Sequence, residues 1–242
     1  MATQTSRAKR LIKLLERLLK KSRQSNPQKQ PLVITESLFS MEGTTAPIKE
    51  ISKLCIKYDS KLLIDEAHAF GVMGSGGKGE SFGLKEPVSI ISGTLGKAFG
   101  SGGAFLATDK ITGENLIQNS GAFRYTTALA PPLCASALAA LNLIESNPNW
   151  GSELKEKSIA LRDKLSQIGW QRPVGVGPII SIILGSDELA LDYQKRLEAN
   201  GLLTVAIRPP TVPEGKSRLR LVIRRNTPDQ AFERLIEILK NK

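Results

Sequence analysis

Two hydrophobic patterns alternate along this chain. In the segments between short apolar runs, apolar residues recur at the three- and four-residue spacing of one helix face, as in Ile48, Ile51, Leu54 and Cys55 after Pro47. The short runs are typical of buried strands and lie at 32–35, 61–64, 88–92, 104–107 and 179–184. Strands that alternate with helices in this way predict parallel βαβ units, and therefore an α/β fold with a mostly parallel sheet.

The pattern changes near the middle of the chain. Pro131 and Pro132 open a long apolar helix that runs to about Ile144, and the turn-rich stretch SNPNWG at 146–151 predicts a domain boundary. A helix, a strand, a helix to Ala199, two more strands and a final helix then predict a small α+β domain. We therefore expect three parts: a basic segment at 1–30, part of a larger α/β domain at 31–145, and a small domain at 146–242.

The first 30 residues are the most basic part of the chain. They hold nine Lys and Arg against one acid, Glu16, a net charge of +8 out of +11 for the whole chain. Leu11, Leu14, Leu15 and Leu18 fall at helical spacing, which predicts an amphipathic helix over about 8–22. Such a helix is also found on membrane surfaces, on nucleic acids and in organelle transit segments. We favour a helix that precedes the strand at 32–35 and packs its apolar side on the sheet. Few aromatic residues interleave the charges, which weakens the nucleic-acid alternative.

Composition narrows the class of protein. The chain is 40% hydrophobic and 24% charged, as in ordinary soluble proteins, and no apolar run approaches membrane-spanning length. Cys55 and Cys134 stand far apart without metal-ligand spacing, which favours two core positions in a reducing compartment such as the cytoplasm. The run GSGGKG at 74–79 matches GxGxxG, but no helical pattern follows it, so it is a weak dinucleotide signal. We expect no metal, no nucleic acid and no membrane span.

The candidate chemistry lies at the ends of two neighbouring strands. Asp65 ends the run LLID, and Lys97 stands 32 residues later in the glycine-rich run SGTLGKAFGSGG. Pyridoxal phosphate needs a carboxylate facing its ring nitrogen and a lysine amine that holds its aldehyde. His68 could reach the phenolic oxygen, and Thr94 with its neighbouring glycines offers donors to a phosphate. Alone, each is more often a surface lysine, a capping aspartate or a core histidine. Together, beyond the carboxyl ends of strands, they predict a cofactor site.

Five runs carry a wider resemblance: VITESLFSMEGTTAPI, LLIDEAHAFGVMGSGGKG, SGTLGKAFGSGG, YTTALAPP and AIRPPTVPEGKSRLRLVI. In this order they resemble the α-oxoamine synthases, a pyridoxal-phosphate family of the aminotransferase fold, over about residues 32–240. The resemblance implies a fold type I large-domain portion followed by a small α+β domain. It also implies that Lys97 is the Schiff-base lysine, that Asp65 pairs with the pyridine nitrogen, that His68 and Ser40 contact the ring or its phenolic oxygen, and that Thr94 binds the phosphate.

The resemblance extends to substrate and subunit contacts. Thr126 and Thr127 match a position that in relatives reaches the cofactor phosphate of the neighbouring subunit, which implies a homodimer. Arg220 matches the group that binds the amino-acid carboxylate, a task that suits the two parallel N–H bonds of a guanidinium. Thr211 matches a substrate-contacting position. Without the resemblance, Ser40, Thr211 and Arg220 would pass for ordinary polar residues.

The C-terminal run is most similar to members that condense L-alanine with a pimeloyl thioester, on coenzyme A or a carrier protein, to give 8-amino-7-oxononanoate in biotin synthesis. Sister members with glycine C-acetyltransferase or serine palmitoyltransferase activity stay open as alternatives. Relatives also carry a large N-terminal portion with a glycine-containing turn under the phosphate and a residue that stacks on the ring, and this chain has no match to it. A truncated, inactive subunit that acts only with a partner supplying that half is therefore a third alternative.

Overall fold

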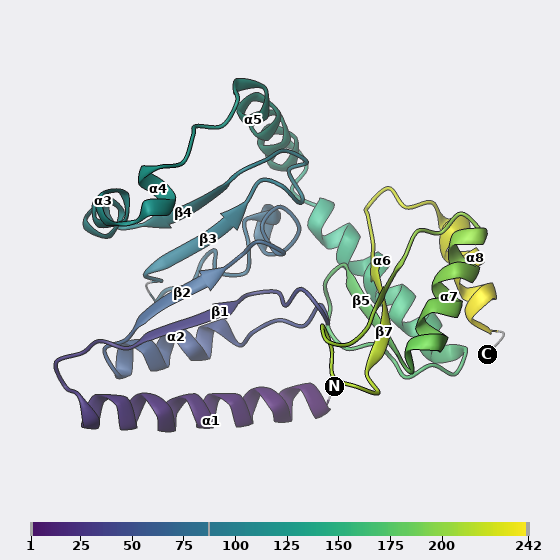
Figure 1. Cartoon of the computed structure of the whole chain (residues 1–242), viewed down its shortest axis with the longest axis horizontal. Coiled ribbons are helices and arrows are strands. Elements are labelled where there is room, and N and C mark those ends of the chain that lie inside the picture. The colour runs from purple at the N-terminus through teal and green to yellow at the C-terminus, as the bar shows by residue number, and fades with distance from the viewer. Residues whose placement is uncertain (1, 87, 241–242) are drawn as a thin grey trace. The chain divides into compact units, whose positions relative to one another are not determined.

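A computed structural model describes residues 2–86 and 88–240 (Figure 1). The chain forms two compact units. The first comprises Met1–Leu38 and Ala46–Gly151, and the second comprises Phe39–Thr45 and Ser152–Lys242. A seven-residue segment from the first fifth of the sequence thus belongs to the C-terminal unit.

The first unit is built on a four-stranded sheet in the order β1-β2-β3-β4 (Figure 1). Strands β1, β2 and β3 are parallel, whereas β4 runs antiparallel to β3. The mostly parallel sheet predicted from the sequence is confirmed. The strand bounds are Leu32–Glu36 for β1, Lys61–Asp65 for β2, Ile90–Thr94 for β3 and Ala104–Thr108 for β4.

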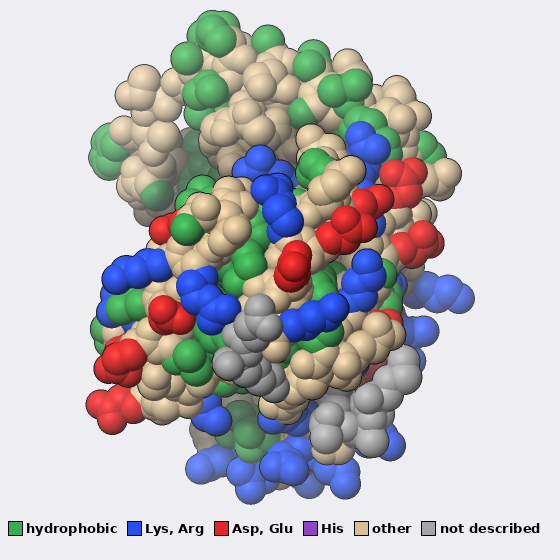
Figure 2. All heavy atoms as spheres, turned by 90° about the vertical axis from the view of Figure 1, so that its right-hand side faces the viewer, with side chains coloured by type: hydrophobic (Ala, Val, Ile, Leu, Met, Phe, Trp, Pro, Cys, Tyr) green, Lys and Arg blue, Asp and Glu red, His purple; other side chains and the backbone are tan. Residues whose placement is uncertain are grey.

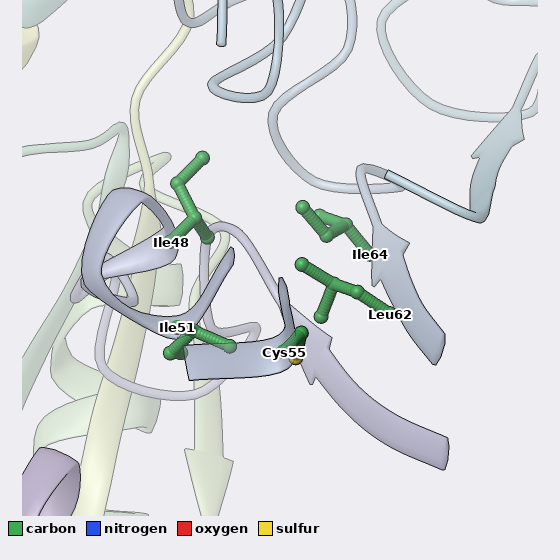
Figure 3. Packing of buried hydrophobic residues seen from close by; sticks show 5 residues of the cluster. All are labelled: Ile48, Ile51, Cys55, Leu62 and Ile64. Atoms are coloured by element: carbon green, nitrogen blue, oxygen red, sulfur yellow. The ribbon is translucent and has the colours of Figure 1, made fainter. Parts of the chain in front are cut away.

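One face of this sheet carries the core of the unit. Helix α2 (Ile48–Lys57) turns Ile48, Ile51 and Cys55 toward Leu62 and Ile64 of β2 (Figure 3). The spacing of these residues on α2 matches the helical repeat, and the two β2 residues alternate along the strand as buried strand residues do. The predicted apolar face of α2 is therefore the face that the structure buries.

Helix α1 (Ala2–Ser25) buries a face that overlaps the predicted stripe only at Leu15. Ile12 and Leu15 pack against the α2–β2 core and Leu19 is 4% exposed, whereas Leu11, Leu14 and Leu18 stay about half exposed. The helix carries two adjacent leucine-rich stripes, and periodicity alone does not decide which of them is buried. Arg and Lys side chains gather at the lower edge of Figure 2, where α1 lies.

Helix α5 (Pro131–Ser146) begins at the predicted proline pair, but Ala137 is its one buried residue. Cys134 on this helix is exposed, so its assignment to the core is wrong. The helix is apolar around most of its circumference, and its sequence therefore does not reveal which side is buried. Two helices that the hydrophobic pattern did not predict precede α5, and neither has a buried residue: α3 (Lys110–Asn119) and α4 (Gly121–Arg124).

The two cysteines are expected to differ sharply in reactivity. Burial raises the pKa of the Cys55 thiol to about 11, and only its thiolate reacts readily with disulfide reagents. At pH 8 the folded chain should react at Cys134 alone, and Cys55 should react only after unfolding. Because the raised pKa favours the thiol in the folded state, this contribution to stability is complete below about pH 9 and is lost as the pH rises toward 11. Thiol titration with and without denaturant, repeated on Cys134→Ser, measures the difference in reactivity. Urea denaturation at pH values between 8 and 11 measures the change in stability.

The second unit contains an antiparallel sheet in the order β5-β7-β6. Leu165, Tyr193, Leu197, Leu219 and Leu239 are buried between this sheet and its helices. No helix in the described part of the chain is both long and apolar enough to cross a bilayer. The elements are α6 (Trp150–Gln167), β5 (Ile179–Gly185), α7 (Asp187–Ala199), β6 (Val205–Ile207), β7 (Ser217–Val222) and α8 (Asp229–Lys240).

Arg162 of α6 is fully buried in the second unit, and it donates to the carbonyl oxygens of Ser158, Val174 and Ile179. Burial lowers its pKa to about 10. Replacing it by alanine should lower the free energy of unfolding by about 3 kcal/mol, because a cavity forms and carbonyl groups lose a donor. Arg172→Ala, which removes an exposed ion pair with Asp163, should cost less than about 1 kcal/mol. Urea denaturation of both variants tests this, and equal losses would contradict it.

Candidate active site

Asp65 lies at the carboxyl end of β2, on the opposite face of the sheet from the buried Leu62 and Ile64. Its Oδ1 accepts the Ala67 N–H at 2.8 Å, and its Oδ2 accepts the Ser92 hydroxyl at 3.3 Å. These two donors fix the plane of the carboxylate.

The face that carries Asp65 is open. Leu32 and Ile34 of β1 lie on the same face, and they are 53% and 65% exposed. Asp65 pairs in register with Ser92 of β3, and Thr94 follows two residues later on the same face. A ligand therefore has access to the carboxylate and to the end of β3 from one side of the sheet.

Lys97 stands at the exposed tip of the loop that joins β3 to β4. Backbone hydrogen bonds close this loop: Leu95 N–H donates to Gly103 O at 2.9 Å, and Gly100 N–H donates to Lys97 O at 3.1 Å. Gly100 has a φ of 58°, a conformation that glycine adopts without strain. The Thr94 hydroxyl is engaged within the loop, since it donates to Gly103 O at 3.1 Å and accepts the Gly96 N–H at 3.2 Å.

The segment after Asp65 packs directly on the Lys97 loop. The rings of Phe70 and Phe99 stack with their centroids 4.9 Å apart. Gly71 lies so close to the loop that an added Cβ would stand 2.6 Å from the Cβ of Ala98. Since His68 lies between Asp65 and Phe70 in the chain, these contacts bring the Asp65–His68 segment and Lys97 into one region of the first unit.

The segment with the two threonines is attached to the same loop. A Cβ on Gly103 would stand 2.5 Å from Leu129 Cδ1, and the Ser101 hydroxyl donates to Leu133 O at 2.6 Å. Thr126 and Thr127 themselves are exposed, and the Thr126 hydroxyl donates to the carbonyl of Ala122.

Ser40 and Arg220 come together in the second unit. The Arg220 Nε donates to the Ser40 carbonyl at 2.8 Å, across 180 positions of sequence. Burial lowers the pKa of Arg220, and within the described residues no carboxylate forms an ion pair with it. The neighbouring Arg218 is different, because its guanidinium pairs with Glu42 at 2.7 Å. Arg220 is therefore the member of the RLRL run that is available to an anionic ligand.

Thr211 is the third predicted site residue in the second unit. It is exposed in the turn between β6 and β7, where its N–H donates to Arg208 O at 3.0 Å. No hydrogen bond connects it with Arg220 in the described residues.

Glu66, which no sequence motif singles out, is the most buried acid among the described residues of the first unit, at 1% exposure. Its carboxylate accepts the N–H groups of Glu80 and Ser81, which follow the GSGGKG run. The run forms a compact turn around η1 (Ser75–Gly77) that closes on the protein's own carboxylate. The glycine-rich sequence of this run is therefore accounted for by the turn, and no bound dinucleotide is needed to explain it.

Comparison with known proteins identifies the family. The family model described as aminotransferase class I and II matches residues 6–239. The chain belongs to this family. The resemblance found in the sequence runs and the aminotransferase fold that it implied are both confirmed.

Individual members of this family show which proteins the chain is similar to. An 8-amino-7-oxononanoate synthase from Methylobacillus flagellatus is 39% identical over 227 residues, which cover 93% of this chain and 56% of that protein. The solved 8-amino-7-oxononanoate synthase of Francisella tularensis is 26% identical with a TM-score of 0.77, over 91% of this chain and 65% of that one. Sphingomonas wittichii serine palmitoyltransferase is 25% identical with a TM-score of 0.86, over 95% and 58%. The chain spans about half the length of the curated relatives it matches.

Proposed function

We propose that the chain carries the covalent cofactor site of a pyridoxal-phosphate-dependent α-oxoamine synthase that condenses L-alanine with a pimeloyl thioester to give 8-amino-7-oxononanoate. The observation that carries the proposal is that the segment directly after Asp65 and His68 packs on the Lys97 loop, through Phe70 with Phe99 and Gly71 with Ala98. The sequence relatives named 8-amino-7-oxononanoate synthase support the choice of reaction.

The side chains at the ends of β2 and β3 are of the types that can hold pyridoxal phosphate. An oriented carboxylate, Asp65, and an exposed lysine amine, Lys97, lie at the ends of adjacent strands, and Thr94 stands at the base of the Lys97 loop. When bound, the cofactor supplies an electron sink for the negative charge that develops at the substrate Cα. Asp65 would hold a proton on the ring nitrogen, because an ionised carboxylate stabilises the charged pyridinium. His68 and Ser40 would contact the ring or its phenolic oxygen.

The remaining roles belong to side chains that meet the substrate. The Lys97 Nζ would hold the cofactor in the resting enzyme and then take the proton from the alanine Cα as a general base. The Nη groups of Arg220 would bind the alanine carboxylate, with the guanidinium plane fixed by the bond from Nε to the Ser40 carbonyl. Thr211 would contact the substrate. The alanine Cα then attacks the thioester carbonyl, which forms the new carbon–carbon bond as the thiol leaves. The carboxylate is lost from Cα as carbon dioxide, and Cα takes up a proton in its place.

A homodimer completes the proposal. Thr126 and Thr127 would reach the cofactor phosphate of the neighbouring subunit, and their exposure on a segment anchored to the Lys97 loop supports this role. Serine palmitoyltransferase activity is the second candidate, favoured by the similarity to the Sphingomonas wittichii structure.

The test starts from cofactor capture. The purified chain is incubated with pyridoxal phosphate and reduced with borohydride, and the modified lysine is mapped by mass spectrometry. We expect stoichiometric labelling of Lys97, whereas labelling spread over exposed lysines such as Lys78 would reject the proposal. Product assays with alanine, glycine or serine, each combined with pimeloyl, acetyl or palmitoyl thioesters, then distinguish the two candidate reactions.

A further inference from the structure

A buried carboxylate follows Asp65 directly. The Glu66 Oε2 accepts the Ser37 hydroxyl at 2.6 Å and the Glu80 N–H at 3.2 Å, and Oε1 accepts the Ser81 N–H at 2.7 Å. Within the described residues, no Lys or Arg forms an ion pair with Glu66. A buried carboxylate without a cation depends on such hydrogen bonds, since removing a charge from water costs several kcal/mol.

The partners of Glu66 also hold Asp65. Ser37, whose hydroxyl binds the Glu66 carboxylate, donates its backbone N–H to the Asp65 carbonyl at 2.9 Å. The Glu66 N–H donates to the carbonyl of Ser92 at 2.7 Å, and the hydroxyl of the same Ser92 binds Asp65 Oδ2. The side chain and the backbone of Glu66 therefore fix both neighbours of Asp65, one on β3 and one just after β1.

The turn beyond η1 is shaped around the same carboxylate. Gly79 has a φ of +90°, and a Cβ there would lie 2.9 Å from Glu66 Cδ. The Gly79 N–H donates to Met73 O at 2.9 Å, which presents the following two N–H groups to Glu66. Only glycine fits this position, so the turn and the carboxylate form one unit.

We propose that Glu66 is a positioning residue, which holds Asp65 in the orientation required to bond to the ring nitrogen of the cofactor. Its side chain acts through Ser37 and the turn at 79–81, its backbone N–H acts through Ser92, and it does not touch the cofactor. The catalytic consequence rests on the proposed function. The orientation of Asp65 itself rests only on its hydrogen bonds with the Ala67 N–H and the Ser92 hydroxyl.

The first test uses amide hydrogen exchange on the cofactor-free protein. The Ala67 N–H binds Asp65 Oδ1 and therefore reports the position of that carboxylate. Glu66→Ala should speed exchange at Glu80 and Ser81, which lose their acceptor, and also at Ala67, by roughly tenfold or more. Glu66→Gln, which keeps one acceptor oxygen and the shape, should partly restore all three. Faster exchange at Glu80 and Ser81 with an unchanged Ala67 would reduce Glu66 to an anchor of the turn and overturn the proposal.

The second test reads the consequence in the loaded enzyme. We expect Glu66→Ala to lower kcat roughly ten- to a hundredfold with little change in the KM for alanine, since misorientation of a catalytic group acts on the chemical step. Glu50→Ala, an exposed acid on α2, is the matched control and should leave both constants unchanged.

If Glu66→Ala fails to fold, Ser37→Ala removes one of the three bonds and should give a smaller loss of Ala67 protection. A wild type that binds no cofactor would reject the proposed function, and the exchange data would still decide the role of Glu66.

Discussion

Lys97→Ala is expected to abolish the covalent attachment of pyridoxal phosphate and to lower kcat by roughly a thousandfold or more. The variant loses both the amine that holds the cofactor and the general base at the substrate Cα, and a general base alone contributes about 10²–10⁴-fold. The fold should survive, because Lys97 is exposed at the loop tip and the loop is closed by backbone bonds at Leu95 and Gly100. Absorbance of the bound cofactor and steady-state kinetics measure the two effects.

Lys78→Ala is the matched control for this experiment. Lys78 is exposed and glycine-flanked like Lys97, but it lies in the turn that closes on Glu66, where its amine stands over the Phe82 ring. Its replacement should leave cofactor capture intact. Borohydride-stable labelling that persists in Lys97→Ala and disappears in Lys78→Ala would transfer the role to the other lysine.

Asp65→Asn is expected to retain cofactor capture and to lower kcat roughly a hundred- to a thousandfold, a range typical of losing one preorganised electrostatic contact. The amide preserves the size of the side chain and an oxygen for the Ala67 N–H, but it lacks the charge that keeps the ring nitrogen protonated. Lys97 should still be labelled after borohydride treatment, which separates this variant from Lys97→Ala.

Asp163→Asn on α6, an exposed acid paired with Arg172, serves as the control for the loss of one negative charge. We expect wild-type kinetics from it. Asp65→Asn with unaltered kcat would contradict the proposed contact with the ring nitrogen, whereas failure to bind any cofactor would indicate that Asp65 also supports the shape of the site.

Much of the sheet that carries the candidate site can be predicted from the sequence, because its strands coincide with short apolar runs. The runs at 61–64 and 88–92 end one to two residues from the observed ends of β2 and β3, so Asp65 was placed at a carboxyl end by pattern alone. The short helices α3 and α4 bury no residue, and without an apolar face they have no periodicity to detect.

Contacts that are distant in sequence could not be predicted in the same way. The bond from Arg220 to Ser40 spans 180 positions, and no local pattern encodes it. The burial of Glu66 is equally hidden, since its partners come from Ser37 and from a glycine turn that reads as flexible surface. Local propensity specifies elements, whereas the choice between two leucine stripes on α1 depends on the packing of the whole unit.

The seven residues Phe39–Thr45 are joined to the second unit by more than one bond. Arg218 pairs with Glu42, the Ser181 hydroxyl binds the Met41 carbonyl, and Gly43 approaches Ile179 so closely that no Cβ would fit. A fragment that starts at Ser152 would therefore lack an integral piece of its own interior. Domain dissection of this protein calls for a circularly permuted or co-expressed peptide rather than a single cut at the interdomain junction.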